Sequence, residues 1–192
     1  MTAQISNDVI VATEYIEAPP EVVFPYFTDP ALIIKWIGDR AELNPQPGGV
    51  FSLGMGQVTA CGAFITVEPP YRVAFSWGIP GSDTLPPGGS AVEVVLTPDG
   101  HGTMVVLSHR GLRAADIGTH RAGWEHQLGL LRVAAGLGGP GYSGLVPPSE
   151  RAEGGGPPGH SLRAPGALGR DEPLVARNCL RRQPPTGRVR KM

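Results

Sequence analysis

Six short segments, apolar or alternating between apolar and polar residues and separated by glycine and proline, constrain the fold of this chain more than any other feature. Their lengths are those of β-strands, and the turn signal Pro98-Asp99-Gly100 joins the last two as a hairpin. Strands linked in this way form an antiparallel sheet with one face that needs an apolar cover. We therefore expect strands at 41–44, 50–55, 58–67, 71–77, 91–96 and 103–109.

A long amphipathic segment directly after these strands can supply that cover. Trp124, Leu128, Leu131 and Ala135 recur at spacings of four, three and four, which makes an apolar stripe on a helix predicted at 118–137. His120 lies one turn earlier on the same stripe. The helix also contains Gly123 and Gly129, each of which costs about 1 kcal/mol relative to alanine. We expect these glycines to allow close approach to the sheet, or to leave room beneath the helix.

The first part of the chain is predicted to add one strand and two short helices. Residues 9–16 are rich in β-branched and aromatic side chains and precede Pro19-Pro20, as at the end of a strand. A helix is predicted from Pro20 to Phe27, because proline is favoured in the first helical turn. Asp29 is the expected N-cap of a second helix at 31–36.

Composition divides the chain near Pro140. Residues 140–192 contain 9 prolines and 9 glycines in 53 positions, and 9 basic against 4 acidic residues give a net charge of +5. No periodic apolar run occurs there, so the segment cannot bury enough surface to offset its ordering entropy. We predict a folded domain at 1–139 and a Pro/Gly/Arg-rich disordered tail at 140–192. The basic end of this tail is expected to contact nucleic acid or acidic lipid only weakly.

Composition also argues against several classes of protein. The 192 residues carry a net charge of −1, unlike a strongly basic nucleic-acid binder. Cys61 and Cys179 are too few for a disulfide framework. No stretch reaches 18 apolar residues and the N-terminus lacks a signal-peptide pattern, so we expect a cytoplasmic protein without a membrane span.

His120 and His126 lie about 240° apart around a helix and cannot share an ion, so no metal site is predicted.

No motif for catalysis or for a cofactor stands out. Ser143 falls short of a Gly-x-Ser-x-Gly elbow, and no predicted strand precedes it. Gly54-x-Gly56 lacks the third glycine and the strand-to-helix context of a dinucleotide loop. The glutamates have no spacing that indicates acid–base work. We therefore predict no cofactor and no catalytic residue, and binding is a better expectation than enzymatic activity.

The order of one strand, two helices, six strands and a long helix resembles the helix-grip arrangement of START-like (SRPBCC) domains. Several motifs further resemble the subgroup related to the C-terminal domain of activators of the Hsp90 ATPase. These motifs are Ile16-Glu17-Ala18-Pro19-Pro20-Glu21-Val22-Val23-Phe24, Thr28-Asp29-Pro30 with Trp36, Pro47-Gly48-Gly49-Val50-Phe51, Val67-Glu68-Pro69-Pro70-Tyr71-Arg72-Val73 through Ser76-Trp77, Gly102-Thr103 with His109, and His120-x-x-Gly123-Trp124. The resemblance implies an α+β fold in which a curved antiparallel sheet of about seven strands wraps on a long C-terminal helix, with two short helices after the first strand.

Three functions are compatible with this resemblance. The first is binding of a small hydrophobic or aromatic ligand between the sheet and the C-terminal helix, without catalysis. The second is a cyclase or dehydratase that uses a cavity histidine as general base. The third is a chaperone-associated module like the Hsp90 activators, and a homodimer is a further expectation about partners.

Nine residues are candidates for lining the implied cavity. For the aromatic ones, packing in the core is the simpler interpretation, and for the histidines it is hydrogen bonding to the backbone or to each other. The candidates are Trp36, Phe51, Phe64, Phe75, Trp77, His109, His120, Trp124 and Leu128.

We predict that residues 1–139 fold alone. Deleting residues 141–192 removes no periodic apolar face, so the free energy of unfolding should change by less than about 1 kcal/mol. Chemical denaturation of the full and truncated chains measures this difference. Aggregation of the truncated chain, or loss of its cooperative transition, would show that the tail packs on the domain.

Overall fold

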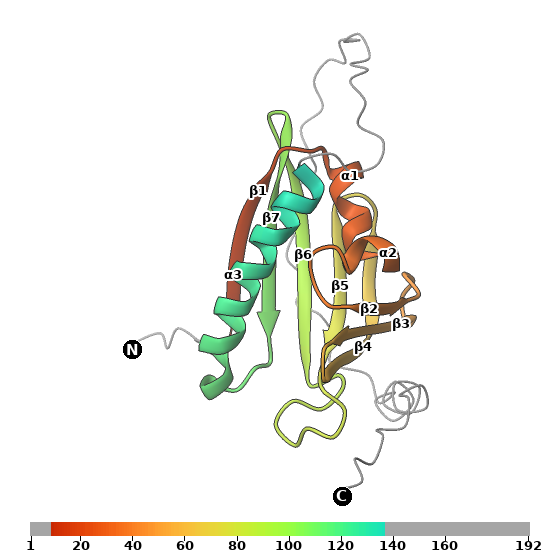
Figure 1. The fold of residues 1–192 in the computed structure, drawn as a ribbon, viewed down its shortest axis with the longest axis vertical. Coiled ribbons are helices and arrows are strands. Elements are labelled where there is room, and N and C mark those ends of the chain that lie inside the picture. The colour runs from red at the N-terminus through yellow and green to blue at the C-terminus, as the bar shows by residue number, and fades with distance from the viewer. Residues whose placement is uncertain (1–8, 137–192) are drawn as a thin grey trace, which may run out of the picture.

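A seven-stranded antiparallel sheet in the order β1-β7-β6-β5-β4-β3-β2 forms the body of the domain (Figure 1). It is seen in a computed structural model that describes residues 9–136 of the chain. The predicted tail therefore lies outside the described residues. The first strand pairs with the last, since Val9 lies opposite Arg110. The strands are β1 (Val9–Ile16), β2 (Arg40–Leu43), β3 (Val50–Met55), β4 (Val58–Glu68), β5 (Arg72–Trp77), β6 (Ser90–Asp99) and β7 (Gly102–Arg110).

Alternation of side chains along the strands decides which face is covered. In β7, Val105, Leu107 and His109 are buried, whereas the residues between them are half-buried. The predicted hairpin is confirmed, but β6 continues through Asp99, which pairs with Gly102. The loop is therefore only two residues long and begins at Gly100, whose φ of +59° is one that glycine adopts without strain.

Two short helical segments follow β1, as predicted. The first is divided into α1 (Pro20–Val23) and the 3-10 turn η1 (Phe24–Phe27). Asp29 is confirmed as an N-cap, because its Oδ1 accepts a hydrogen bond of 2.7 Å from the backbone N–H of Ala31. The helix that it caps, α2 (Pro30–Ile33), ends earlier than predicted.

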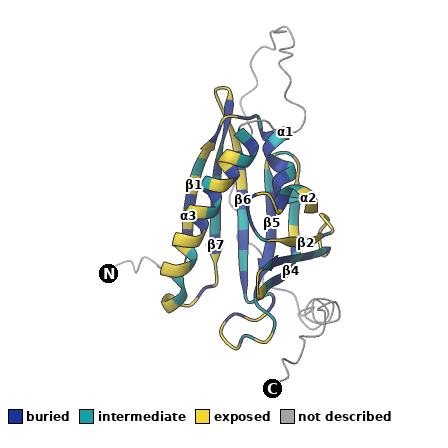
Figure 2. Cartoon of the chain, viewed as in Figure 1, coloured by how far each residue is buried: buried dark blue, intermediate teal, exposed yellow. Residues whose placement is uncertain are grey.

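The long helix α3 (Ala114–Gly136) lies over β1 and β7 (Figure 1). It begins four residues earlier than predicted, and its buried side chains are those of the expected stripe, Trp124, Leu128, Leu131 and Ala135. Figure 2 shows that the outward side of α3 is exposed. No helix within residues 9–136 combines the length and the apolar character needed to cross a membrane.

Two contacts fix α3 from opposite sides. Arg132 forms an ion pair of 3.1 Å with Glu14 of β1. On the other side, the hydroxyl of Tyr26 in η1 donates a hydrogen bond of 2.8 Å to the carbonyl oxygen of Ala134. Both contacts lie in the C-terminal half of the helix.

The glycines of α3 do not have the predicted role. A Cβ atom placed on Gly118, Gly123 or Gly129 would meet no atom within 4 Å. These positions therefore need no glycine for close approach to the sheet, and Gly118 and Gly123 are exposed to solvent rather than placed beneath the helix. Their effect is to lower the intrinsic helix stability of this segment.

We predict that Gly123→Ala stabilises the domain by about 1 kcal/mol, because alanine removes the backbone entropy cost without a clash. Urea denaturation measures the change. Gly62→Ala is the matched control and should destabilise, since a Cβ at Gly62 would overlap the carbonyl oxygen of Ser76. A destabilised Gly123→Ala variant would mean that α3 lies closer to a neighbour than described.

Candidate functional site

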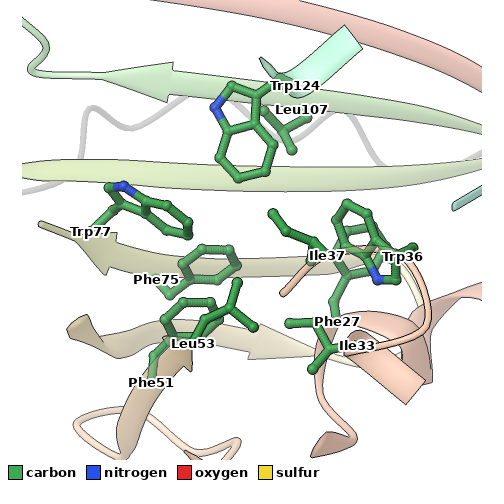
Figure 3. Close-up of a pocket in the computed structure, with 10 residues that line it drawn as sticks. All are labelled: Phe27, Ile33, Trp36, Ile37, Phe51, Leu53, Phe75, Trp77, Leu107 and Trp124. Carbon is green, nitrogen blue, oxygen red and sulfur yellow. The ribbon is translucent and has the colours of Figure 1, made fainter. Parts of the chain in front are cut away.

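An apolar pocket lies between the sheet, the short helices and α3 (Figure 3). Its free volume is about 10 Å³, roughly the room of one water molecule. Any larger guest therefore requires side chains to move. The lining residues are Phe27, Ile33, Trp36, Ile37, Phe51, Leu53, Phe75, Trp77, Leu107 and Trp124.

Aromatic rings form a continuous series across this pocket. Phe51 and Phe75 stack with ring centroids 3.9 Å apart and an interplanar angle of 7°. Trp77 continues the series from Phe75, and Trp124 of α3 meets Trp77 edge-to-face at 5.4 Å and 63°. Such pairs add about 0.5–1.5 kcal/mol each beyond the area that they bury. The pocket wall is therefore well packed as well as apolar.

A buried chain of hydrogen bonds holds Trp124 in place. The Nε1–H of Trp124 donates to Nδ1 of His109 at 3.0 Å, and Nε2 of His109 lies 2.9 Å from Oγ of Ser90. The hydroxyl of Ser90 donates in turn to the carbonyl oxygen of Trp77 at 2.9 Å. This chain connects α3 to β7, β6 and β5 directly beside the pocket.

The direction of these hydrogen bonds determines which ring nitrogen of His109 carries a proton. An indole N–H only donates, so Nδ1 must accept and carries no proton. Nε2 then carries the proton and donates to Ser90. The pKa of His109 is lowered from 6.5 to about 3, mainly by burial and to a smaller extent by the electrostatic interaction with nearby His120. His109 is therefore neutral at physiological pH, and both of its ring nitrogens are hydrogen-bonded.

His120 lies next to His109 but differs from it in burial and in which ring nitrogen carries the proton. Their ring centroids are 5.4 Å apart, and His120 is only half-buried. Its Nδ1 lies 3.0 Å from the carbonyl oxygen of Asp116, which requires a proton on Nδ1. In the neutral form the lone pair of His120 is consequently on Nε2.

The structure brings most of the candidate residues together. Trp36, Phe51, Phe75, Trp77 and Trp124 line the pocket, and His109 and His120 contact one another at the Trp124 end. Phe64 is buried behind Phe51 and Phe75, and Leu128 is buried further along α3. Neither of these two lines the pocket.

Sequence reasoning missed several residues of this site. Phe27, Ile33, Ile37 and Leu53 come from the turns and short strands whose position on the sheet depends on tertiary packing. Ser90 could have been found, because the hairpin register places Val92 opposite His109 and brings the start of β6 next to it.

A curved antiparallel sheet that grips a long C-terminal helix, with short helices after the first strand, defines the helix-grip class. The family model described as "Activator of Hsp90 ATPase homolog 1-like protein" matches residues 17–136. This chain belongs to that family, within the START-like domains, as its motifs predicted. No curated protein matches the chain.

Three solved structures illustrate the similarity. The AHSA1-like protein RHE_CH02687 from Rhizobium etli is 38% identical, with 76% of this chain and 94% of that one covered and a TM-score of 0.52. CalU16 from Micromonospora echinospora is 30% identical, with coverages of 66% and 75% and a TM-score of 0.55. PFC0360w, an Hsp90 activator from Plasmodium falciparum, shares the fold at 24% identity, with coverages of 66% and 95% and a TM-score of 0.56.

His109 is predicted to make the domain sensitive to acid. Between pH 6.5 and about 3 the unfolded chain binds a proton at this histidine that the native state does not. Stability is complete above pH 6.5 and is lost as the pH falls, by about 1.4 kcal/mol per unit for this group. Urea denaturation at pH 7, 6 and 5 measures the slope.

The contribution of His109 is isolated by His109→Gln, which should have a smaller slope than the unaltered protein. His101→Gln is the control, because His101 is exposed in the β6–β7 turn. Equal slopes for His109→Gln and the unaltered protein would contradict a buried neutral His109.

Trp124 is predicted to be the most damaging single residue to truncate. Trp124→Ala removes a buried ring and its hydrogen bond, and should lower the free energy of unfolding by about 3–5 kcal/mol. Val133→Ala on the outward side of α3, where Val133 is 54% exposed, should change it by no more than about 0.5 kcal/mol. An unchanged melting temperature for Trp124→Ala would show that Trp124 does not pack in the core.

Proposed function

We propose that this domain binds a small apolar molecule with an aromatic ring in the pocket beside Trp124. The observation that supports this is the convergence of ten apolar side chains, six of them aromatic, from both helical and strand elements. Sites for small molecules are typically concave and apolar with few polar groups.

Binding requires the pocket to open, since its free volume is only about 10 Å³. Trp124 is the side chain best suited to move. The contacts of Glu14 and Tyr26 hold the C-terminal half of α3, whereas Gly118 and Gly123 lower helix stability on either side of His120. A ligand ring that takes the place of the indole would keep its aromatic contacts with Trp77 and His109.

Titration with ethylbenzene, followed by two-dimensional NMR of the ¹⁵N-labelled protein, tests this proposal. We expect saturable shifts of the backbone and indole signals of the lining residues. Leu107→Phe and Ile37→Phe, which each fill the pocket, should weaken binding at least tenfold, whereas Val133→Phe on the exposed side of α3 should not. The absence of binding, or shifts that map away from the pocket, would refute the proposal.

A chaperone-associated role is the second candidate, and the family match favours it. PFC0360w is an Hsp90 activator, and a similar partner for this domain would be another protein rather than a small molecule. Pull-down with an Hsp90 homologue tests this role. Failure to bind in the presence of nucleotide would remove it.

A cyclase or dehydratase would need a base with a free lone pair. His109 does not meet this requirement, because both of its ring nitrogens are hydrogen-bonded within the core. His120 has its lone pair on Nε2 and is the histidine that such a mechanism would use. Because His120 is not among the residues that line the pocket, ligand binding is better supported than a cyclase or dehydratase activity.

A further inference from the structure

The place that the indole of Trp124 occupies has an apolar side and one polar atom. Trp124 is 5% exposed, and its ring lies edge-to-face to the rings of Trp77 and His109, with centroids 5.4 Å and 5.9 Å away. Figure 3 shows its six-membered ring directed toward the other lining side chains and its nitrogen on the far edge. From that edge Nε1–H donates to Nδ1 of His109 at 3.0 Å. A ligand ring in the place of the indole therefore meets the apolar pocket on one side and this nitrogen on the other.

Nδ1 of His109 can only accept a hydrogen bond. The hydroxyl of Ser90 has a single proton and donates it to the carbonyl oxygen of Trp77 at 2.9 Å. The contact of 2.9 Å between Ser90 and Nε2 of His109 therefore requires the imidazole proton to be on Nε2. If the proton moved to Nδ1, Ser90 would have to give up one of its two hydrogen bonds.

Displacement of Trp124 leaves this acceptor without a donor. His109 is completely buried, and burial lowers its pKa to about 3, so protonation of the ring does not compensate. The adjacent His120 directs its Nδ1 proton to the carbonyl oxygen of Asp116 at 3.0 Å and, when neutral, has only a lone pair on Nε2. Since a buried acceptor without a partner weakens binding, a ligand that supplies the missing donor is favoured.

Trp77 carries the other indole donor near this place. Its Nε1 is buried without a hydrogen-bond partner within residues 9–136, and its ring centroid lies 6.2 Å from that of His109. To donate to Nδ1, Trp77 would have to turn and disrupt its ring contacts with Phe51 and Phe75. A donor on the ligand satisfies Nδ1 without this rearrangement.

We propose that the ligand of this pocket is an aromatic compound with one hydrogen-bond donor on the edge of its ring, as in indoles and phenols. Its N–H or O–H donates to Nδ1 of His109 in place of Trp124. The other lining side chains form an apolar wall, so further polar groups directed into the pocket would lose their water without compensation. This inference rests on the proposed binding function and specifies its ligand.

Two pairs of probes with matched shape test the inference: indole with benzothiophene, and 4-ethylphenol with 4-ethyltoluene. The second probe of each pair lacks the donor and is the more apolar one, so a preference for the first cannot come from hydrophobicity. We expect the donor to tighten binding about tenfold in each pair, because the other probe leaves Nδ1 unpaired. NMR titration of the ¹⁵N-labelled protein measures the four dissociation constants.

The ¹⁵N signal of Nδ1 in the unaltered protein is a second readout, which does not depend on the folding of a variant. With indole bound, Nδ1 of His109 should keep the chemical shift of a hydrogen-bonded acceptor. With benzothiophene it should move toward that of an acceptor without a donor. With either probe, Nε1–H of Trp124 should exchange faster with solvent, because it has left His109.

One variant and its control assign the acceptor. His109→Phe keeps a buried ring but removes the acceptor, and should abolish the preference for the donor in both pairs. His120→Phe is the matched control, because His120 lies beside His109, with ring centroids 5.4 Å apart, but does not bond to Trp124. It should keep both preferences.

The possible failures are distinguishable. Equal affinities within both pairs, or a preference that survives His109→Phe, overturn this inference and leave the binding function intact. A downfield move of the Trp77 indole proton on binding also overturns it, since Trp77 and not the ligand would then be the donor. If none of the four probes binds, the proposed function fails and this inference fails with it.

Discussion

The hydrogen bond from Trp124 to His109 is the contact on which the arrangement of α3 over the sheet depends. The helix carries glycines that weaken it, and its firm polar contacts to β1 and η1 lie in its C-terminal half. Near the pocket, the position of α3 is set by one indole and the histidine beneath it. His109 of β7 is in turn oriented by Ser90 of β6, which bonds to the backbone of β5. The orientation of the indole therefore depends on three neighbouring strands.

Because the position of α3 depends on Trp124, the packing of the helix and the proposed binding of a ligand involve the same side chain. Trp124 is at once a core residue, a hydrogen-bond donor and a wall of the pocket. A ligand that displaces it must compensate for the bond to His109 as well as for the aromatic contacts. Because burial keeps His109 neutral, the bond is present throughout the physiological range of pH. In the proposed binding function, the domain therefore rests in a closed state, and opening requires a guest with sufficient apolar surface.

Much of the fold could be predicted because its signals are local and periodic. The stripe of Trp124, Leu128 and Leu131 and the cap at Asp29 each depend on residues close together in sequence, and the structure confirms them. The beginning of α3 was not predicted, since Arg113, the residue directly before it, is not a typical N-cap residue.

The site was harder to predict than the fold. The role of Gly123 depends on distances to other elements, which no local pattern encodes. The contribution of Ile37 and Leu53 likewise depends on how the short helices and β3 pack on the sheet. The unpaired state of the Trp77 indole is invisible in sequence, because any tryptophan has the same donor and only the finished packing leaves it without an acceptor.

The tautomer of His109 tests the account most directly. Long-range ¹H–¹⁵N correlation spectra distinguish a protonated from an unprotonated ring nitrogen. We predict that His109 has an unprotonated Nδ1 and a protonated Nε2 from pH 8 down to about pH 4, as the bonds from Trp124 and to Ser90 require. A proton on Nδ1, or a doubly protonated ring at pH 6, would contradict the account.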